Sequence, residues 1–195
     1  MHRIRIKYKK SLIFIGHLDM VRLWERAIRR ADIPVVYSQG FNPRQKLSFG
    51  PPLSLGIASD CEFLDIYLDK WLGPEFVKED LTKTLPEGIE IIDSTNVFPG
   101  MESLSSFIKT AVYEIRTDGD MSKRIGEILA STEILVERKE KKLNIRPMIK
   151  QLSQDGKIIT IAVQCDNYGS IKAQEIKALF PQISSMDLRR THLLP

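Results

Sequence analysis

The sequence predicts an α+β protein made of two tandem ferredoxin-like sandwiches, and three observations support this class. The apolar periodicities of residues 1–98 follow the order strand, helix, two strands, helix, strand, which is the β-α-β-β-α-β pattern of that sandwich. Residues 99–195 repeat the alternation with weaker periodicity. A length of 195 residues also accommodates two domains of about 100 residues each.

In the first domain, 1–98, alternation of apolar and polar residues predicts strands at 2–8, 46–49, 61–68 and 89–92. A 3.6-residue period predicts helices at 18–31 and 74–85. Asp32-Ile33-Pro34 ends the first of them, because the residue before a proline is pushed out of the α region. Pro74 suits the first turn of the second.

In the second domain, 99–195, residues 95–106 form the connection and helices are predicted at 122–130 and 171–179. Strands are predicted at 107–116, 132–138, 158–163 and 188–194. The basic segment 139–142 reads as a solvated hairpin tip. The pattern of 145–152 leaves its structure open between helix and strand.

The positive charge is concentrated at one end of the chain. The formal net charge is +4, yet residues 1–50 carry eleven Lys and Arg against three acidic residues, a balance of +8. The remaining residues therefore balance to −4. This polarity fits a site for a polyanion on the first domain, and a basic surface without a partner is the alternative.

The helix at 18–31 has two contrasting faces. Its apolar arc predicts a helix lying on a core, with Trp24 inside that core. Its opposite arc carries four arginines and no lysine: Arg22, Arg26, Arg29 and Arg30. A guanidinium offers charge and a forked set of donors, so we expect these side chains to bind phosphates. A solvated face partly paired with Asp19 and Glu25 is the alternative.

A loop rich in turn formers follows the short apolar run 35–37. Phe41 is a candidate to stack on an unpaired base, or else it pins the loop into the core. Gln39 and Asn42 can bond base edges or close turns, and Gly40 supplies an unusual backbone angle. Arg44 and Lys46 would extend the phosphate track. The predicted RNA-binding residues are therefore Arg22, Arg26, Arg29, Arg30, Gln39, Phe41, Asn42, Arg44 and Lys46.

His17 is a weak candidate for a general acid–base group, because imidazole titrates near neutrality. The structural alternative is that His17 caps the helix, while Asp19 suits the positive end of the helix dipole.

Several classes of protein are not indicated. The sequence has no glycine-rich nucleotide fingerprint, no nucleophile elbow and no grouping of its three His and two Cys, so no cofactor and no metal site are predicted. Cys61 and Cys165 are expected to be buried thiols in a reducing cytoplasm. The polar N-terminus does not fit a signal peptide, and no apolar run reaches the roughly 20 residues that span a bilayer.

The best-marked segments resemble a known bacterial family. They are FIGHLD at 14–19, the arginine helix at 22–31, YSQGFNP at 37–43, and the shorter matches at 47–49, 52–53 and 55–56. This pattern is similar to that of the radical-SAM-associated, or radical-SAM-linked, proteins. The resemblance implies a partner, because members occur alone or attached to or encoded beside cobalamin-binding radical-SAM proteins. The chain lacks the CxxxCxxC ligands of a radical-SAM core, so it would be an accessory protein.

The leading expectation is thus a cytoplasmic RNA-binding accessory protein that aids tRNA or rRNA modification with a radical-SAM partner. One alternative is a metal-independent endoribonuclease that uses His17. The tandem layout also resembles RNA-processing endonucleases of the CRISPR repeat class. In those enzymes a histidine near the first helix helps cleave RNA. Another is an adaptor whose arginine face docks on an acidic patch of the radical-SAM enzyme without contacting RNA.

Overall fold

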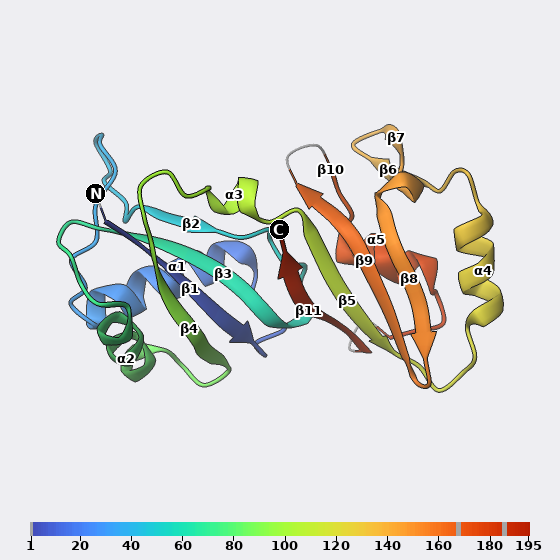
Figure 1. Cartoon of the computed structure of the whole chain (residues 1–195), viewed down its shortest axis with the longest axis horizontal. Helices are drawn as coiled ribbons and strands as arrows, with labels where there is room; N and C mark the ends of the chain where they lie inside the picture. Colours follow the sequence, from blue (N-terminus) through green and yellow to red (C-terminus); the bar gives the residue numbers. More distant parts are fainter. Residues whose placement is uncertain (1, 167–168, 185–186) are drawn as a thin grey trace. The chain divides into compact units, whose positions relative to one another are not determined.

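The computed structural model describes residues 2–166, 169–184 and 187–195 (Figure 1). The chain divides into two compact units, one of Met1–Leu55 with Ser59–Leu104 and one of Gly56–Ala58 with Ser105–Pro195. Both combine helices with antiparallel strands, so the α+β class is confirmed. The boundary after residue 98 stays a prediction about which segments fold independently.

The first unit runs in the order β1 (His2–Lys10), α1 (His17–Arg30), β2 (Leu47–Phe49), β3 (Ala58–Leu68), α2 (Pro74–Thr84) and β4 (Ile89–Val97). Its strands pair in the order β4-β1-β3-β2, and every pair is antiparallel. These bounds confirm the predicted helices and strands of the first unit, with ends that shift by a few residues. β4 is the largest extension, because it continues through Val97 into the expected connection.

The core of the first unit lies on one face of this sheet. Ile4 and Ile6 of β1 and Leu64 and Ile66 of β3 are all fully buried there. Side chains alternate along a strand, so the residues next to these four in β1 and β3 point to the other face. The same cluster includes Trp24 and Ile28 of α1 and Val77 and Leu81 of α2. Both helices therefore cover the same face.

The second unit contains β5 (Thr110–Arg116), α4 (Ser122–Ala130), β8 (Ile149–Asp155), β9 (Ile158–Asp166), α5 (Ala173–Leu179) and β11 (Leu188–Leu194). These strands pair in the order β11-β5-β9-β8, again all antiparallel. A short β10 (Gly169–Ser170) also pairs with β9. The order of pairing in the first unit is thus repeated.

Three segments of the second half differ from expectation or were left open. Residues Leu104–Phe107 form a short helix, α3, so the strand predicted from 107 begins only at Thr110. The open segment 145–152 is a 3-10 turn, η1 (Arg146–Met148), followed by strand β8. The hairpin tip predicted at 139–142 is shorter than expected: β6 (Leu135–Arg138) and β7 (Lys141–Asn144) pair, so only Lys139 and Glu140, which have positive φ angles, form the turn.

Two expectations from composition also have structural counterparts. Cys61 and Cys165 are both buried, as predicted. None of the helices in the described ranges has the length and apolarity needed to cross a membrane.

Candidate nucleic-acid interface

Helix α1 separates its apolar and basic residues as predicted. Met20, Trp24, Ala27 and Ile28 are buried, and the Trp24 indole meets the Tyr8 ring edge-on with centroids 5.0 Å apart. The prediction that Trp24 belongs to the core is therefore confirmed. The four predicted phosphate ligands are exposed: Arg22, Arg26, Arg29 and Arg30.

The contacts of three of these arginines use only part of each guanidinium. Arg22 Nη1 lies 3.3 Å from Asp19 Oδ1, with both side chains more than half exposed. Arg26 Nε donates to the Arg22 carbonyl at 3.2 Å, and Arg30 Nη2 donates to the Thr84 carbonyl of α2 at 2.6 Å. A guanidinium has five N–H donors. One or two such contacts therefore leave donors available to a ligand.

The end of α1 directs the chain away from the helix. Asp32 adopts a positive φ of 52°, which reverses the backbone before Pro34. Val35 then forms an isolated bridge with Leu68 of β3, and Tyr37 forms another with Gln45. The apolar run 35–37 thus returns along the edge of the sheet and leads into the loop.

The loop at 38–44 is closed by its own ends. Ser38 N donates to the Arg44 carbonyl at 2.8 Å, and Arg44 N donates to Ser38 Oγ at 3.0 Å. Gly40 has a φ of +126°, which other residues rarely adopt. Phe41 is fully exposed, so it does not pin the loop into the core. Gln39 and Asn42 are exposed beside it.

Two contacts hold the base of this loop against the middle of α1. Gln45 Nε2 donates to the Glu25 carbonyl at 3.2 Å, and Arg44 Nη1 lies 3.9 Å from Glu25 Oε1. Arg22 and Arg29 stand three residues before and four residues after Glu25, so they are its neighbours on the helix surface. The structure therefore brings Arg44 to the same side of α1 as Arg22 and Arg29.

Lys46 begins the return into strand β2. Its backbone N donates to the Val36 carbonyl at 2.7 Å, and its ammonium lies 4.8 Å from the centroid of the Tyr67 ring. Lys46 thus sits at the edge of the sheet, while Arg44 sits beside the helix.

His17 is exposed at the first turn of α1, and its ring meets Phe49 edge-on with centroids 5.7 Å apart. The residue at the N-cap position is Gly16, and no side chain caps the helix there. The expectation that His17 caps α1 is therefore wrong, because His17 already belongs to the helix. Asp19 lies in the first turn, as expected near the positive end of the dipole.

A small hollow opens beside His17, with a volume of about 20 Å³, roughly the room of one water molecule. Tyr8, Lys10 and Glu62 line it, and all three are buried. Glu62 stands directly opposite Tyr8 in the β1–β3 register, which places it on the helix-covered face. Sequence reasoning missed Lys10 and Glu62. The one signal in the sequence was a carboxylate, Glu62, that pairs with a buried tyrosine, Tyr8, on the neighbouring strand. This pairing can be recognised only when the strand register is known.

A family profile, described as uncharacterized proteins conserved in bacteria (DUF2344), matches residues 3–173. The chain belongs to the DUF2344 family. The matched span of the DUF2344 profile includes every predicted RNA-binding residue and ends at the first residue of α5. No curated protein matches the chain.

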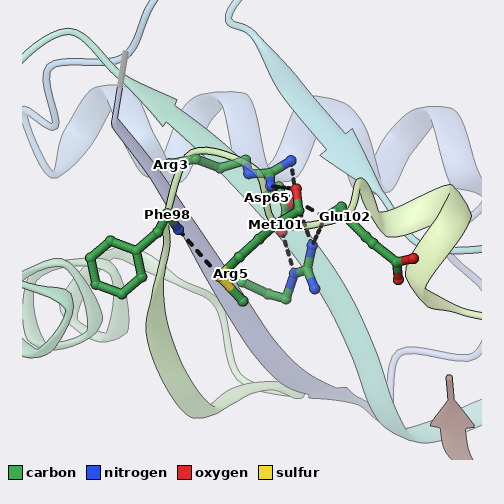
Figure 2. Close-up of polar contacts among 6 residues, drawn as sticks. All are labelled: Arg3, Arg5, Asp65, Phe98, Met101 and Glu102. Atoms are coloured by element: carbon green, nitrogen blue, oxygen red, sulfur yellow. Dashed lines mark hydrogen bonds and ion pairs between the residues drawn. The ribbon is translucent and has the colours of Figure 1, made fainter.

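The protein also has a basic cluster on the other face of its first sheet (Figure 2). Arg5 forms two hydrogen bonds with the fully buried Asp65, and Arg3 Nη1 lies 3.5 Å from the same carboxylate. Both guanidiniums also donate to main-chain oxygens: Arg3 to Met101 and Glu102, and Arg5 to Glu102. The alternation of residues 3–7 predicted outward cations, but it gave no indication of this shared acidic partner.

Within the described ranges, no three His, Cys, Asp or Glu side chains gather in a group able to hold a metal ion. The exposed aromatic side chains, again among the described residues, all belong to the first unit: Phe14, Tyr37, Phe41, Trp71, Phe76 and Phe98. They share that unit with the +8 segment of the chain. Of these, Phe41 lies in the loop that contacts α1, and an aromatic side chain beside basic groups is usual in a surface for unpaired nucleic acid.

Proposed function

We propose that this protein is a cytoplasmic RNA-binding accessory protein that presents tRNA or rRNA to a radical-SAM enzyme. The observation that carries the RNA part is the contact of Arg44 with Glu25, which sets the loop beside Arg22 and Arg29. Phosphates would lie along α1 and reach Arg44, while the exposed Phe41, Gln39 and Asn42 would meet bases.

The architecture in this proposal is a pair of tandem ferredoxin-like sandwiches. The repeated pairing orders, β4-β1-β3-β2 and β11-β5-β9-β8, support it. The radical-SAM partnership rests on the resemblance of the GHLD and YSQGFNP segments. Pull-down of radical-SAM enzymes from the same bacterium, with and without nuclease, separates an RNA-bridged partner from a direct one. Capture that resists nuclease, together with no RNA affinity, would favour the adaptor alternative.

Filter binding of RNA as a function of salt concentration tests the RNA proposal. Each phosphate neutralised on a single strand contributes a slope of about −0.7 in log affinity against log salt. Replacing Arg22, Arg26, Arg29 and Arg30 with Gln should therefore reduce the slope by roughly 3 and weaken binding at every salt concentration.

The matched control replaces three cations of the β6–β7 hairpin with Gln: Lys139, Lys141 and Lys142. We expect this variant to keep the wild-type slope. A flat slope for the wild type, no RNA affinity at low salt, or an equal loss in both variants would overturn the proposal.

A second candidate function is metal-independent RNA cleavage, and the hollow beside His17 favours it. Lys10 and Glu62, both buried, place an ammonium and a carboxylate along the walls of the hollow that His17 also lines. Side chains of these types are the ones that general acid–base catalysis uses. Incubation with RNA and EDTA decides this candidate. Cleavage that His17→Ala abolishes and His192→Ala preserves supports it, since His192 is exposed on β11; intact RNA removes it.

A further inference from the structure

Tyr67 lies on the face of the first sheet opposite to the helices. The β1–β3 register places Arg3 directly across from Tyr67, while Ile4 and Ile66 form the next pair. Ile4 and Ile66 point into the core beneath α1 and α2. Because side chains alternate along a strand, Arg3 and Tyr67 share the opposite face.

Two cations stand beside the Tyr67 ring. Lys46 Nζ lies 4.8 Å from the ring centroid, and Arg3 Cζ lies 5.8 Å from it. Tyr67 N also donates to the Lys46 carbonyl at 3.3 Å, so the two residues are neighbours through the backbone as well. Lys46 is exposed, and Tyr67 and Arg3 are half-buried. We name these three residues the Tyr67 strip.

Arg3 is held in place before any ligand arrives. Its Nη2 donates to the carbonyls of Met101 at 3.0 Å and Glu102 at 3.2 Å, and its Nη1 faces Asp65 (Figure 2). Asp65 carries one negative charge and is shared with Arg5. The cluster of two guanidiniums and one carboxylate therefore keeps a net positive charge under the strip.

We propose that the Tyr67 strip binds one unpaired nucleotide of RNA, with the base against the Tyr67 ring and the neighbouring phosphates on Lys46 and Arg3. The proposal rests on the proposed function and specifies its substrate as single-stranded RNA. Aromatic side chains on the central strands of an antiparallel sheet are a recurrent platform for unpaired bases. Bases inside a duplex cannot reach such a ring.

The contact of Lys46 with the ring does not block this binding. An exposed cation–π contact is weaker than the stacking of a base on an aromatic ring. The lysine stem is flexible, so the ammonium can move from the ring to a phosphate. Lys46 is two residues beyond Arg44 in the chain.

Fluorescence polarisation of the full chain tests this inference, with a 20-nucleotide oligouridine strand and the same strand annealed to oligoadenosine as probes. Tyr67→Ala should weaken binding of the single strand roughly 5- to 100-fold and leave duplex binding within about twofold. Tyr67→Phe keeps the ring and should bind as the wild type does. Phe76→Ala removes an exposed aromatic from α2, on the helix-covered face, and serves as the matched control.

Equal affinity of Tyr67→Ala and wild type for the single strand would overturn the inference, as would equal losses on both probes. A wild type that binds only the duplex contradicts the strip but leaves RNA binding standing. A wild type that binds neither probe contradicts the proposed function itself. If Tyr67→Ala fails to fold, crosslinking of wild type to 4-thiouridine RNA decides: crosslinks in the peptide containing Tyr67 support the strip, and crosslinks only elsewhere reject it.

Discussion

Arg5 binds Asp65 through two parallel hydrogen bonds, Nε to Oδ1 at 2.7 Å and Nη2 to Oδ2 at 3.0 Å. The two residues are cross-strand partners in the β1–β3 ladder, and the carboxylate is fully buried. A planar guanidinium matches a carboxylate in this two-point geometry, which lysine cannot reproduce. The pair is therefore a rigid base for the face that carries Tyr67.

Replacing Asp65 should leave two guanidiniums beside a neutral group that no longer balances their charge. We expect Asp65→Asn to lower the free energy of unfolding by about 3–5 kcal/mol, the usual loss when one partner of a buried pair is removed. Urea denaturation measures it. Asp69→Asn, at an exposed position just beyond the same strand, is the control and should change stability by less than about 0.5 kcal/mol. Equal effects of the two variants would contradict the prediction.

A comparison of alanine substitutions at Gly88 and Gly100 distinguishes the cost of backbone strain from the cost of a steric clash. Both have positive φ angles, +90° and +91°, but a Cβ at Gly88 would lie 2.8 Å from Leu12 Cγ, while a Cβ at Gly100 would meet nothing within 4 Å. Gly88→Ala should therefore destabilise the protein more than Gly100→Ala, by about 1–3 kcal/mol. Leu12→Ala in the Gly88→Ala background should recover part of the difference. Equal urea midpoints for the two single variants would show that Leu12 moves aside freely.

Gln45 offers a test of the contact between loop and helix that removes no charge. Gln45→Leu deletes the hydrogen bond to the Glu25 carbonyl while Arg44 and Lys46 remain. This hydrogen bond contributes about 1 kcal/mol to holding the loop in position, and its loss corresponds to roughly fivefold weaker RNA binding. The salt slope should stay unchanged, because the number of cations is the same. Gln151→Leu, exposed on β8, is the matched variant; full RNA affinity of Gln45→Leu would mean that the loop orients independently.

The acid stability of the second unit should depend on Glu175. Burial raises the pKa of Glu175, but hydrogen bonds from Arg138 and from the Lys172 N–H outweigh burial, and the pKa ends below the usual 4.5. A lowered pKa in the folded state gives stability that is present above about pH 4.5 and is lost as the pH falls through the folded value. The urea midpoint of the wild type should thus decline more steeply below pH 4.5 than that of Glu175→Gln. Parallel declines would contradict this assignment.

The helices and strands of the first unit were predictable because each carries a clean period. Residues 2–8 alternate strictly, and the helix of Trp24 segregates its arginines from its apolar residues. The short helix at Leu104–Phe107 was missed because four residues show no period. β7 was missed as a strand because a run of lysines resembles a turn more than a strand.

The candidate site was predictable only in its residue types. That Phe41 stays in solvent and that Arg44 lies beside Glu25 depend on how the loop folds back on α1, which no local pattern encodes. Tyr67 was placed on a strand by its alternation, but its cations come from residues 21 and 64 positions earlier in the chain. Such long-range neighbours follow from strand register, so a single sequence does not reveal them.

The hydrogen bonds of Arg3 and Arg5 to the segment after β4 have an evolutionary consequence. Arg3 donates to the peptide oxygens of Met101 and Glu102, Arg5 donates to that of Glu102, and every residue type supplies such an oxygen. These hydrogen bonds therefore do not constrain which side chains stand at these two positions, but they do fix the length and path of the segment. Homologues should vary freely at position 102 and tolerate insertions in this segment poorly, whereas the Met101 sulfur also accepts the Phe98 N–H at 3.3 Å.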